Sequence, residues 1–302
     1  MIKSSFSIKD LENLSGIKAH TIRIWEKRYH LLEPDRSETN IRFYDLHALQ
    51  KILNVSYLKN SGMKISAIAA LTTEDIEQKV RDLAQSEQKH NHQLQELKLA
   101  MINFDESLFE KVYETELSLK SFEKIFYDLL VPFLEELGNL WQSNTINIAH
   151  EHFISNLIRQ KLLIQMQLVK KKKNEDADKS YILFLPENEM HDLGLLFLNY
   201  KLLIAGFHTI FLGASMDLNT LPFFQRNGSN PTFVTFTTVQ PSSKSLPKFL
   251  KKFNSKLNNA PLVLLGRRTG DLDGNLLTPN QKIFNSIDSA MEYFEQQQPK
   301  IV

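Results

Sequence analysis

The chain contains no cysteine. Disulfides, thiolate-bound metals, iron–sulfur clusters and thiol-based redox sensing are therefore all excluded. The chain also lacks an apolar run of the roughly 18 residues that a membrane-spanning helix needs, and its first residues lack the apolar stretch of a secretory signal. These absences predict a cytoplasmic protein that has no contact with a membrane.

The length of 302 residues predicts two or three domains, and a hydrophobic content of 42% is enough for a buried core in each. The formal net charge of +1 hides an asymmetry, because residues 1–73 hold 11 Lys and Arg against 7 Asp and Glu, an excess of +4. An excess of this size is a weak indication of a nucleic-acid partner, and a solvated basic surface explains it equally well.

Helical periodicity dominates the first 169 residues. Residues 1–75 are predicted to form a small domain with helices over 8–14, 19–28, 46–60 and 65–71, and with a turn-rich hairpin before residue 43. Residues 76–100 are strongly polar and are predicted to be a helical connector. Residues 101–169 have apolar positions at three- and four-residue spacing, which predicts a helix bundle. The charged run 170–179 is predicted to be a linker.

The last segment, residues 180–302, changes character. Strand-like apolar runs at 181–185, 209–212, 232–239 and 262–265 alternate with helical stretches at 192–205, 218–225 and 246–257, and a final helix is predicted over 280–297. This alternation predicts a flavodoxin-like (Rossmann-like) parallel sheet that is covered on both faces. Ligands of such sheets bind outside the carboxyl ends of the strands.

A helix, a tight turn and a second helix near the N-terminus form a unit that can place the second helix in the major groove. The polar residues of that second helix, His20, Thr21, Arg23 and Arg28, are candidate DNA contacts. The two arginines carry guanidinium forks that suit phosphates or guanine edges. Trp25 can instead be a core residue.

Residues 21–29, TIRIWEKRY, together with Leu32-Glu33-Pro34 and Arg42-Phe43-Tyr44, resemble the MerR family of transcriptional regulators over residues 5–72. The resemblance implies a winged helix-turn-helix over residues 1–75. It adds four DNA contacts to the candidates above: Tyr29, Arg36, Arg42 and Tyr44, of which Tyr44 can also be a core residue. Asn40 stands where the family often has glycine, and Asn tolerates the same left-handed backbone.

The run from Glu189 to Gly194, EMHDLG, directly follows the first strand of the α/β segment, at the place where a ligand-binding His belongs. A neutral imidazole at His191 can bind a metal through one nitrogen, while Glu189 or Asp192 holds the other N–H. Without cysteine or a second nearby His, a free zinc or copper ion would lack ligands. A cofactor that brings its own equatorial ligands needs only one axial His.

This run resembles cobalamin-binding domains with the pattern Asp/Glu-x-His-x-x-Gly, which His191 and Gly194 match. The resemblance implies that His191 is the lower axial ligand of cobalt and that Glu189 and Asp192 support it. It also implies that Thr237, Val239 and Gly266 lie around the nucleotide tail of the cofactor. Arg267 stands where those domains have the second glycine of a Gly-Gly pair, and its side chain would either crowd the tail or reach the cofactor phosphate.

A second motif, Trp141 followed by Glu151-His152 after nine intervening residues, resembles MerR-type regulators that bind adenosylcobalamin and respond to light. The resemblance implies that residues 101–169 form a four-helix-bundle cap in which Trp141, Glu151 and His152 face the adenosyl group. Light-responsive members carry a His directly after the motif Trp. This chain has Gln142, which predicts a weak response to light.

The sequence as a whole predicts a multidomain α and α/β protein that is not an enzyme: a DNA-binding regulator, a repressor, controlled by a cobalamin, in the adenosyl form. Its implied partners are an inverted-repeat operator, further copies of the chain in a dimer or tetramer, and RNA polymerase in competition at the promoter. The main alternative is a regulator of the same family that has lost cobalamin and responds to protein partners. An enzyme that handles cobalamin would need a substrate domain, and a dinucleotide-binding enzyme would need a Gly-x-Gly-x-x-Gly run after the first strand. Neither feature is evident.

Overall fold

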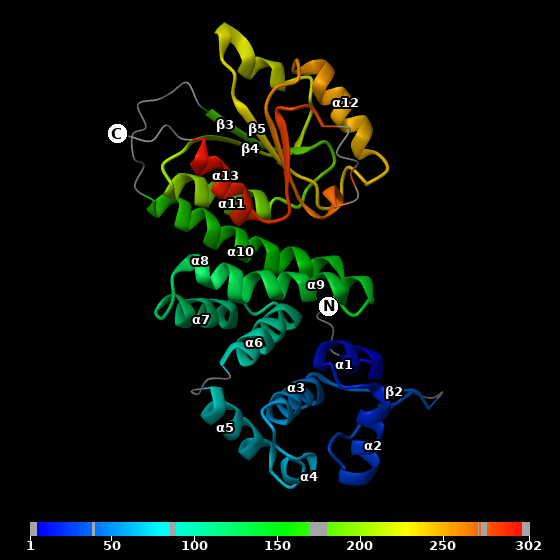
Figure 1. Cartoon of the computed structure of the whole chain (residues 1–302). Helices are drawn as coiled ribbons and strands as arrows, with labels where there is room; N and C mark the ends of the chain where they lie inside the picture. Colours follow the sequence, from blue (N-terminus) through cyan, green and yellow to red (C-terminus); the bar gives the residue numbers. More distant parts are fainter. Residues whose placement is uncertain are drawn as a thin grey trace. The chain divides into compact units, whose positions relative to one another are not determined.

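The computed structural model of the chain describes residues 5–37, 40–84, 89–169, 180–270, 272 and 277–297 (Figure 1). The chain divides into two compact units, Met1–Leu157 and Ile158–Val302. The charged segment 170–179, predicted to be a linker, lies outside the described residues. No helix within the described ranges is long and apolar enough to cross a membrane.

The first unit begins with a winged helix-turn-helix. Its elements are α1 (Ile8–Ser15), α2 (Ala19–Tyr29), β1 (Asp35–Arg36), β2 (Arg42–Phe43), α3 (Leu46–Asn60) and α4 (Ile65–Ile68). Ser7 caps α1, because its hydroxyl accepts a hydrogen bond from the Asp10 backbone N–H while the Asp10 carboxylate accepts one from the Ser7 N–H. Gly16 ends the helix in the left-handed region at φ 75°. The predicted first helix is confirmed.

The wing is an antiparallel hairpin in which Arg36 lies opposite Arg42. Asn40 adopts φ 64°, the left-handed conformation that the sequence predicts for this turn. Phe6 and Tyr44 exchange two backbone hydrogen bonds, of 2.8 and 2.9 Å, and both side chains are buried. The hairpin is therefore anchored to the segment that precedes α1.

Helices make up the rest of the first unit and cross into the second. They are α5 (Thr73–Ala84), α6 (Lys89–Asn103), α7 (Glu106–Leu117), α8 (Phe122–Ile125), the π-helical η1 (Phe126–Leu130), α9 (Val131–Gln142) and α10 (Ile148–Leu168). Within the predicted connector 76–100, the end of α6 buries Leu97 and Ala100, since apolar residues recur there at helical spacing. This end of the segment therefore packs with the bundle, next to α7.

The second unit is an α/β domain with a five-stranded sheet. Its elements, after the end of α10, are β3 (Ser180–Pro186), α11 (Leu193–Ile204), β4 (His208–Met216), η2 (Leu221–Gly228), β5 (Thr232–Phe236), α12 (Leu246–Lys256), β6 (Leu262–Leu265), η3 (Arg267–Thr269), β7 (Gln281–Phe284) and α13 (Ile287–Gln296). The strands are all parallel and lie in the order β4-β3-β5-β6-β7. This is the flavodoxin-like order, in which the direction of winding reverses between β3 and β5. The predicted fold class is confirmed.

Two apolar layers enclose the sheet. On one face, side chains of α11 and α13 such as Leu198 and Phe294 pack with Leu183 of β3. On the other face, side chains of α12 and η2 such as Phe253 and Leu221 complete the core. Figure 1 shows α11 and α13 together on one side of the strands and α12 on the other. The burial of both faces explains why the strands have continuous apolar runs.

The end of the chain differs from the sequence prediction. The single helix predicted over 280–297 is wrong at its start, because Gln281–Phe284 form strand β7 beside β6. The helix α13 begins only after Ser286, whose hydroxyl accepts a hydrogen bond from the Ser289 backbone N–H. A four-residue edge strand has too few positions to show a strand period, and its pairing with β6 decides its conformation. The stretch predicted as a helix over 218–225 is the 3-10 helix η2.

Candidate functional site

A buried carboxylate holds the segment between β3 and α11. Glu189 is fully buried, and its Oε1 accepts hydrogen bonds from the His191 backbone N–H at 3.0 Å and from His191 Nδ1 at 2.5 Å. Its Oε2 accepts hydrogen bonds from the backbone N–H groups of Thr238, Val239 and Gln240 at 3.2, 2.6 and 2.7 Å. One carboxylate therefore joins the two loops that leave β3 and β5, the strands at the switch point of the sheet.

These donors keep Glu189 ionised. Burial raises the pKa of its carboxyl group, but the hydrogen bonds from His191, Gln240 and Val239 outweigh burial and lower the pKa from 4.5 to about 2. The same interaction explains why β5 ends at Phe236 and not at residue 239 as the sequence predicts. The backbone N–H groups that would continue the strand point at the carboxylate instead.

The hydrogen bond to Glu189 fixes the tautomer of the neutral His191 ring. A carboxylate can only accept, so Nδ1 carries a proton, and in the neutral ring Nε2 then carries the lone pair. The side chain of His191 is 52% exposed, so its ring is accessible from solvent. An oriented, accessible imidazole with a carboxylate on its second nitrogen is the usual arrangement of a metal-binding His.

Asp192 has a different partner. Its carboxylate pairs with the Arg159 guanidinium of α10, so the candidate partner of the His191 N–H is Glu189 alone. A second contact of α10 lies nearby, where Asn199 of α11 donates a hydrogen bond to the Met166 sulfur at 3.3 Å. No sequence pattern indicates Arg159, because it lies on a separate helix 33 residues before its partner.

Two glycines near the carboxyl ends of the strands permit a close approach that a side chain would block. Gly266 has φ 112°, and a Cβ there would lie 2.6 Å from the Thr237 carbonyl oxygen. At Gly194, a Cβ would lie 3.0 Å from the ring of Phe236. Thr237 itself is fully buried beneath this contact and Val239 is 39% exposed. A cofactor would thus meet Val239 and the backbone at Gly266, while the Thr237 side chain serves the packing beneath them.

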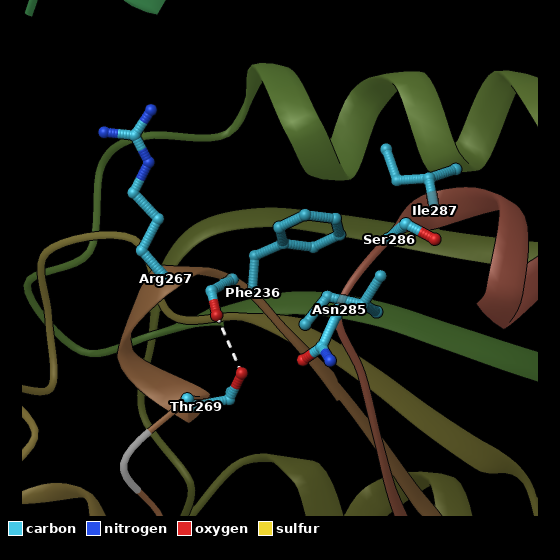
Figure 2. Close-up of a pocket in the computed structure, with 9 residues that line it drawn as sticks. Phe236, Arg267, Thr269, Asn285, Ser286 and Ile287 are labelled. Atoms are coloured by element: carbon cyan, nitrogen blue, oxygen red, sulfur yellow. Dashed lines mark hydrogen bonds between the residues drawn. The ribbon is translucent and has the colours of Figure 1, made fainter.

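A pocket of about 310 Å³ opens at the ends of β5, β6 and β7. It is lined by Phe236, Leu265, Gly266, Arg267, Thr269, Gly270, Asn285, Ser286 and Ile287. Figure 2 shows Phe236, Asn285 and Ser286 around it, with Arg267 extending away from them. The sequence does not indicate Asn285 and Ser286 as site residues, because it predicts a helix over 280–297 and therefore no loop after β7. The residues Ser286 and Ser289 are a helix-cap signal that marks this loop.

The second candidate motif spans the end of α9 and the start of α10. Trp141 is 52% exposed although it is a large aromatic residue. Glu151 accepts a hydrogen bond from the Ser155 hydroxyl at 3.0 Å and lies 3.5 Å from Nδ1 of His152, whose side chain is 67% exposed. The motif therefore offers an aromatic plate and a carboxylate near the surface of the helical region.

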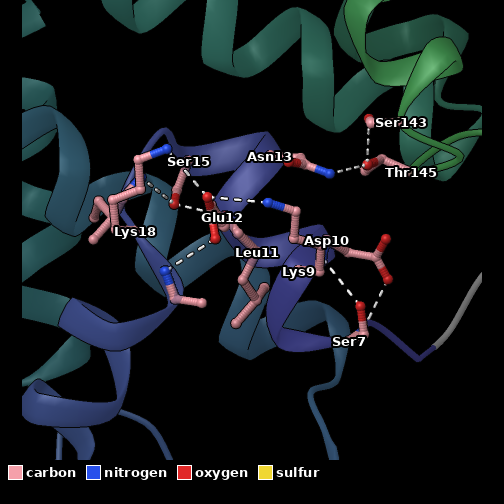
Figure 3. A network of polar contacts seen from close by, with 12 residues as sticks. Ser7, Lys9, Asp10, Leu11, Glu12, Asn13, Ser15, Lys18, Ser143 and Thr145 are labelled. Carbon is pink, nitrogen blue, oxygen red and sulfur yellow. Dashed lines mark hydrogen bonds and ion pairs between the residues drawn. The ribbon is translucent and has the colours of Figure 1, made fainter.

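The loop inside this motif contacts the winged helix-turn-helix. The Asn13 amide of α1 donates a hydrogen bond to the Thr145 hydroxyl at 2.7 Å (Figure 3). Lys98 of α6, which is almost buried, donates to the Leu14 carbonyl oxygen at 3.2 Å and pairs with Glu136 of α9 at 2.5 Å. The helix-turn-helix is thus joined to the helical region through α1 as well as through the chain.

Helix α2 turns one face inward and a basic face outward. Ile22 and Trp25 are buried, so Trp25 is a core residue, which is one of the two roles considered from the sequence. The outward face is formed by exposed residues from each turn of the helix: His20, Arg23, Ile24, Lys27 and Arg28. The Thr21 hydroxyl lies 3.3 Å from the His20 ring, and the Arg28 guanidinium lies 5.2 Å from the centre of the Tyr29 ring. Of the candidate DNA contacts of α2, His20, Arg23 and Arg28 therefore share one exposed surface, whereas Thr21 and Tyr29 are half-buried.

On the wing, the candidate residues divide. Arg36 is exposed and donates a hydrogen bond to Asn40, and Arg42 is one-third exposed with its Nε 3.3 Å from Glu26. Tyr44 differs from the expected DNA contact, because its side chain is 1% exposed and its hydroxyl donates a hydrogen bond to Glu26. Burial, together with Glu26, raises the pKa of Tyr44. Tyr44 therefore fixes the wing against α2.

Comparison with protein families agrees with this division of the chain. Residues 6–75 match the profile of the MerR HTH family regulatory protein, and residues 93–164 match that of the B12 binding domain. The first match covers the winged helix-turn-helix. The second covers most of α6, all of α7 to α9, and most of α10. The chain therefore carries a MerR-type DNA-binding region followed by a B12-binding region.

Two curated relatives cover most of the chain. The HTH-type transcriptional repressor CarH of Myxococcus xanthus is 27% identical over 82% of this chain and 83% of its own length. The repressor CarA of the same organism is 29% identical over 68% of this chain and 67% of its own length. A solved structure, the monomethylamine corrinoid protein of Methanosarcina barkeri, matches with a TM-score of 0.53 at 15% identity, over 67% of this chain and 96% of that one. This last likeness concerns the fold alone.

The ionised Glu189 predicts a pH-dependent stability. Because its folded-state pKa of about 2 lies below the ordinary 4.5, its contribution is complete above pH 4.5 and is lost as the pH falls toward 2. The contribution is worth roughly 3 kcal/mol at neutral pH. We expect Glu189→Gln to lower the unfolding free energy at pH 7 by about that amount and to flatten the acid limb, as measured by urea unfolding with circular dichroism. The exposed neighbour Glu187 is the control, and equal effects of Glu187→Gln and Glu189→Gln would contradict the assignment.

Proposed function

We propose that this chain, with its MerR-type DNA-binding region and its B12-binding region, is a transcriptional repressor whose hold on operator DNA depends on a bound cobalamin. The observation that carries the proposal is His191, which Glu189 orients at the switch point of the sheet in a chain with a DNA-binding head. The two repressors of Myxococcus xanthus support the proposal, because their similarity covers 82% and 68% of this chain.

The residues at the carboxyl ends of the strands fit a corrinoid. His191 would bind the metal through Nε2, and Glu189 would hold the ring in place and raise its basicity. The pocket of about 310 Å³ is at the lower end of the size range of small-molecule sites and would take the nucleotide tail. Gly266 in the pocket wall lets the backbone approach Thr237 closely, because a Cβ there would clash with the Thr237 backbone.

The adenosyl form is the cobalamin that the helical motif suits best. The exposed ring of Trp141 offers a stacking surface for adenine, and the Glu151 carboxylate can accept hydrogen bonds from ribose hydroxyls. His152, beside Glu151, would contribute to the same surface. When bound, adenosylcobalamin supplies a cobalt–carbon bond that light can break. No catalytic step by the protein is part of the proposal.

The DNA partner is an operator with two inverted half-sites. Symmetric pairs of helix-turn-helix heads read half-sites related by a two-fold axis, which requires a dimer or a tetramer of the chain. Arg23 and Arg28 on α2 would contact bases or phosphates, and Arg36 and Arg42 on the wing would contact the backbone. Bound at a promoter, such an oligomer would compete with RNA polymerase.

The rival function is a regulator of the same architecture that does not bind cobalamin. Arg267 favours it, because this long side chain lines the pocket at the position where cobalamin-binding domains have a second glycine. Under this rival, the pocket would be vestigial and protein partners would control the DNA-binding head. Retention of cobalamin by the purified chain separates the two functions.

The first experiment tests cobalt ligation. We expect His191→Ala to lose cobalamin retention at least tenfold while the protein keeps its helix content, since no second imidazole is oriented in this way by Glu189. Gel filtration after incubation with adenosylcobalamin in the dark, with detection at corrin wavelengths, measures retention. The control is His208→Ala, an exposed His at the start of β4. Equal retention by the His191 and His208 variants would reduce His191 to a structural loop residue, and no retention by the wild type would favour the rival.

The second experiment tests the DNA-binding face. Arg23→Ala should weaken specific binding by about 1–3 kcal/mol if its guanidinium reads a guanine edge. A gel-shift titration on a duplex selected from a random-sequence pool by the full chain measures the change. Lys79→Ala, an exposed cation on α5, is the control and should bind as the wild type does. An Arg23 variant with wild-type affinity would contradict the placement of α2 in the groove.

The third experiment concerns light. Gln142 follows Trp141, and an amide is a poor ligand for cobalt compared with imidazole. We therefore expect the oligomer size to stay the same and the operator affinity to change by about twofold or less between darkness and green illumination. Gln142→His should increase the change. His150 is buried against Phe104, whereas His152 is largely exposed. A strong light response of the wild type that His152→Ala removes would contradict the prediction and assign the role to His152.

A further inference from the structure

The outward face of α2 carries an apolar side chain among its charged ones. Ile24 is 53% exposed, whereas Ile22 and Trp25 on the same helix are buried. Its position on the helix places it beside His20, four residues before, and beside Lys27 and Arg28, three and four residues after. A large aliphatic side chain is therefore surrounded by the groups that are expected to meet DNA.

Packing within the described chain does not account for this placement. Leu11, Leu14 and Trp25 fill the core on the inner side of the head, and half of the Ile24 surface remains in contact with solvent. Covering this apolar side chain with a partner would remove it from water, which is favourable. The cations around Ile24 define the charge of that partner, because a partner that covers this face must be anionic.

Duplex DNA offers such a partner both charge and a matching apolar group. Phosphates line the edges of the major groove and would meet Arg28 and Lys27. On the floor of the groove, the C5 methyl group of thymine is the apolar feature of the base edges, and aliphatic side chains contact it. We propose that Ile24 packs against a thymine methyl group and thereby selects a T·A pair at one position in each half-site. The inference rests on the proposed function, because it requires α2 to enter the groove.

The test removes the methyl group from the DNA and the side chain from the protein. A duplex is selected from a random-sequence pool by the full-length chain with adenosylcobalamin in the dark. Each thymine is then replaced singly by deoxyuridine, which keeps base pairing and removes only the methyl group. Dissociation constants are measured for the wild type, Ile24→Ala and Ile24→Val. Ile41→Ala is the matched control, because Ile41 on the wing is 55% exposed.

We expect one thymine in each half-site at which deoxyuridine weakens wild-type binding about fourfold, the factor that burial of one methyl group contributes. Ile24→Ala should abolish sensitivity at that thymine alone, Ile24→Val should keep most of it, and Ile41→Ala should keep all of it. The inference would be overturned if deoxyuridine weakens binding at no thymine, or if Ile24→Ala keeps the sensitivity to deoxyuridine. If no duplex is selected, or Arg23→Ala binds as the wild type does, the proposed function itself fails.

Discussion

The carboxylate of Glu189 is the constraint on which the cofactor site depends. A fully buried negative charge is costly unless donors surround it, and here five hydrogen bonds from two loops converge on its two oxygens. Without that charge, the loop after β5 would have no reason to leave the sheet at Phe236, and His191 would have no fixed tautomer. The position of the switch point explains why one residue can do this, since β3 and β5 are neighbours in the sheet although 45 residues of the chain lie between the two strands. The Glu189 carboxylate thus positions both the candidate metal ligand and the loop beside it.

A different interaction organises the first unit. Lys98 is almost buried between the end of α1 and the Glu136 carboxylate, and Asn13 reaches the loop that lies between Trp141 and Glu151. The DNA-binding head is therefore part of one compact unit with the helices that match the B12 binding domain. Under the proposed function, α1 therefore touches the segment that faces the adenosyl group. Helix α1 directly precedes α2, the helix that would read the DNA.

Much of this architecture could be predicted from the sequence, because the signals are local. The cap at Ser7, the stop at Gly16, the run TIRIWEKRY and the His191 pattern all lie within short segments. The remainder depended on contacts between distant residues. β7 is a strand because β6 offers it backbone partners, Asp192 pairs with an arginine from another helix, and the Tyr44 hydroxyl is buried on Glu26. The missed strand also hid Asn285 and Ser286 in the pocket wall, so one error of secondary structure removed two candidate site residues.

The central claim is that cobalamin controls the affinity of this chain for DNA. The most direct measurement is a dark gel-shift titration of the full-length chain on its selected duplex, with and without saturating adenosylcobalamin. We expect an affinity at least about tenfold higher with the cofactor, a coupling of about 1.4 kcal/mol, and the loss of this difference in His191→Ala. Equal affinity of the wild type in both conditions would contradict the account, because a ligand that does not discriminate between the DNA-binding states cannot control them.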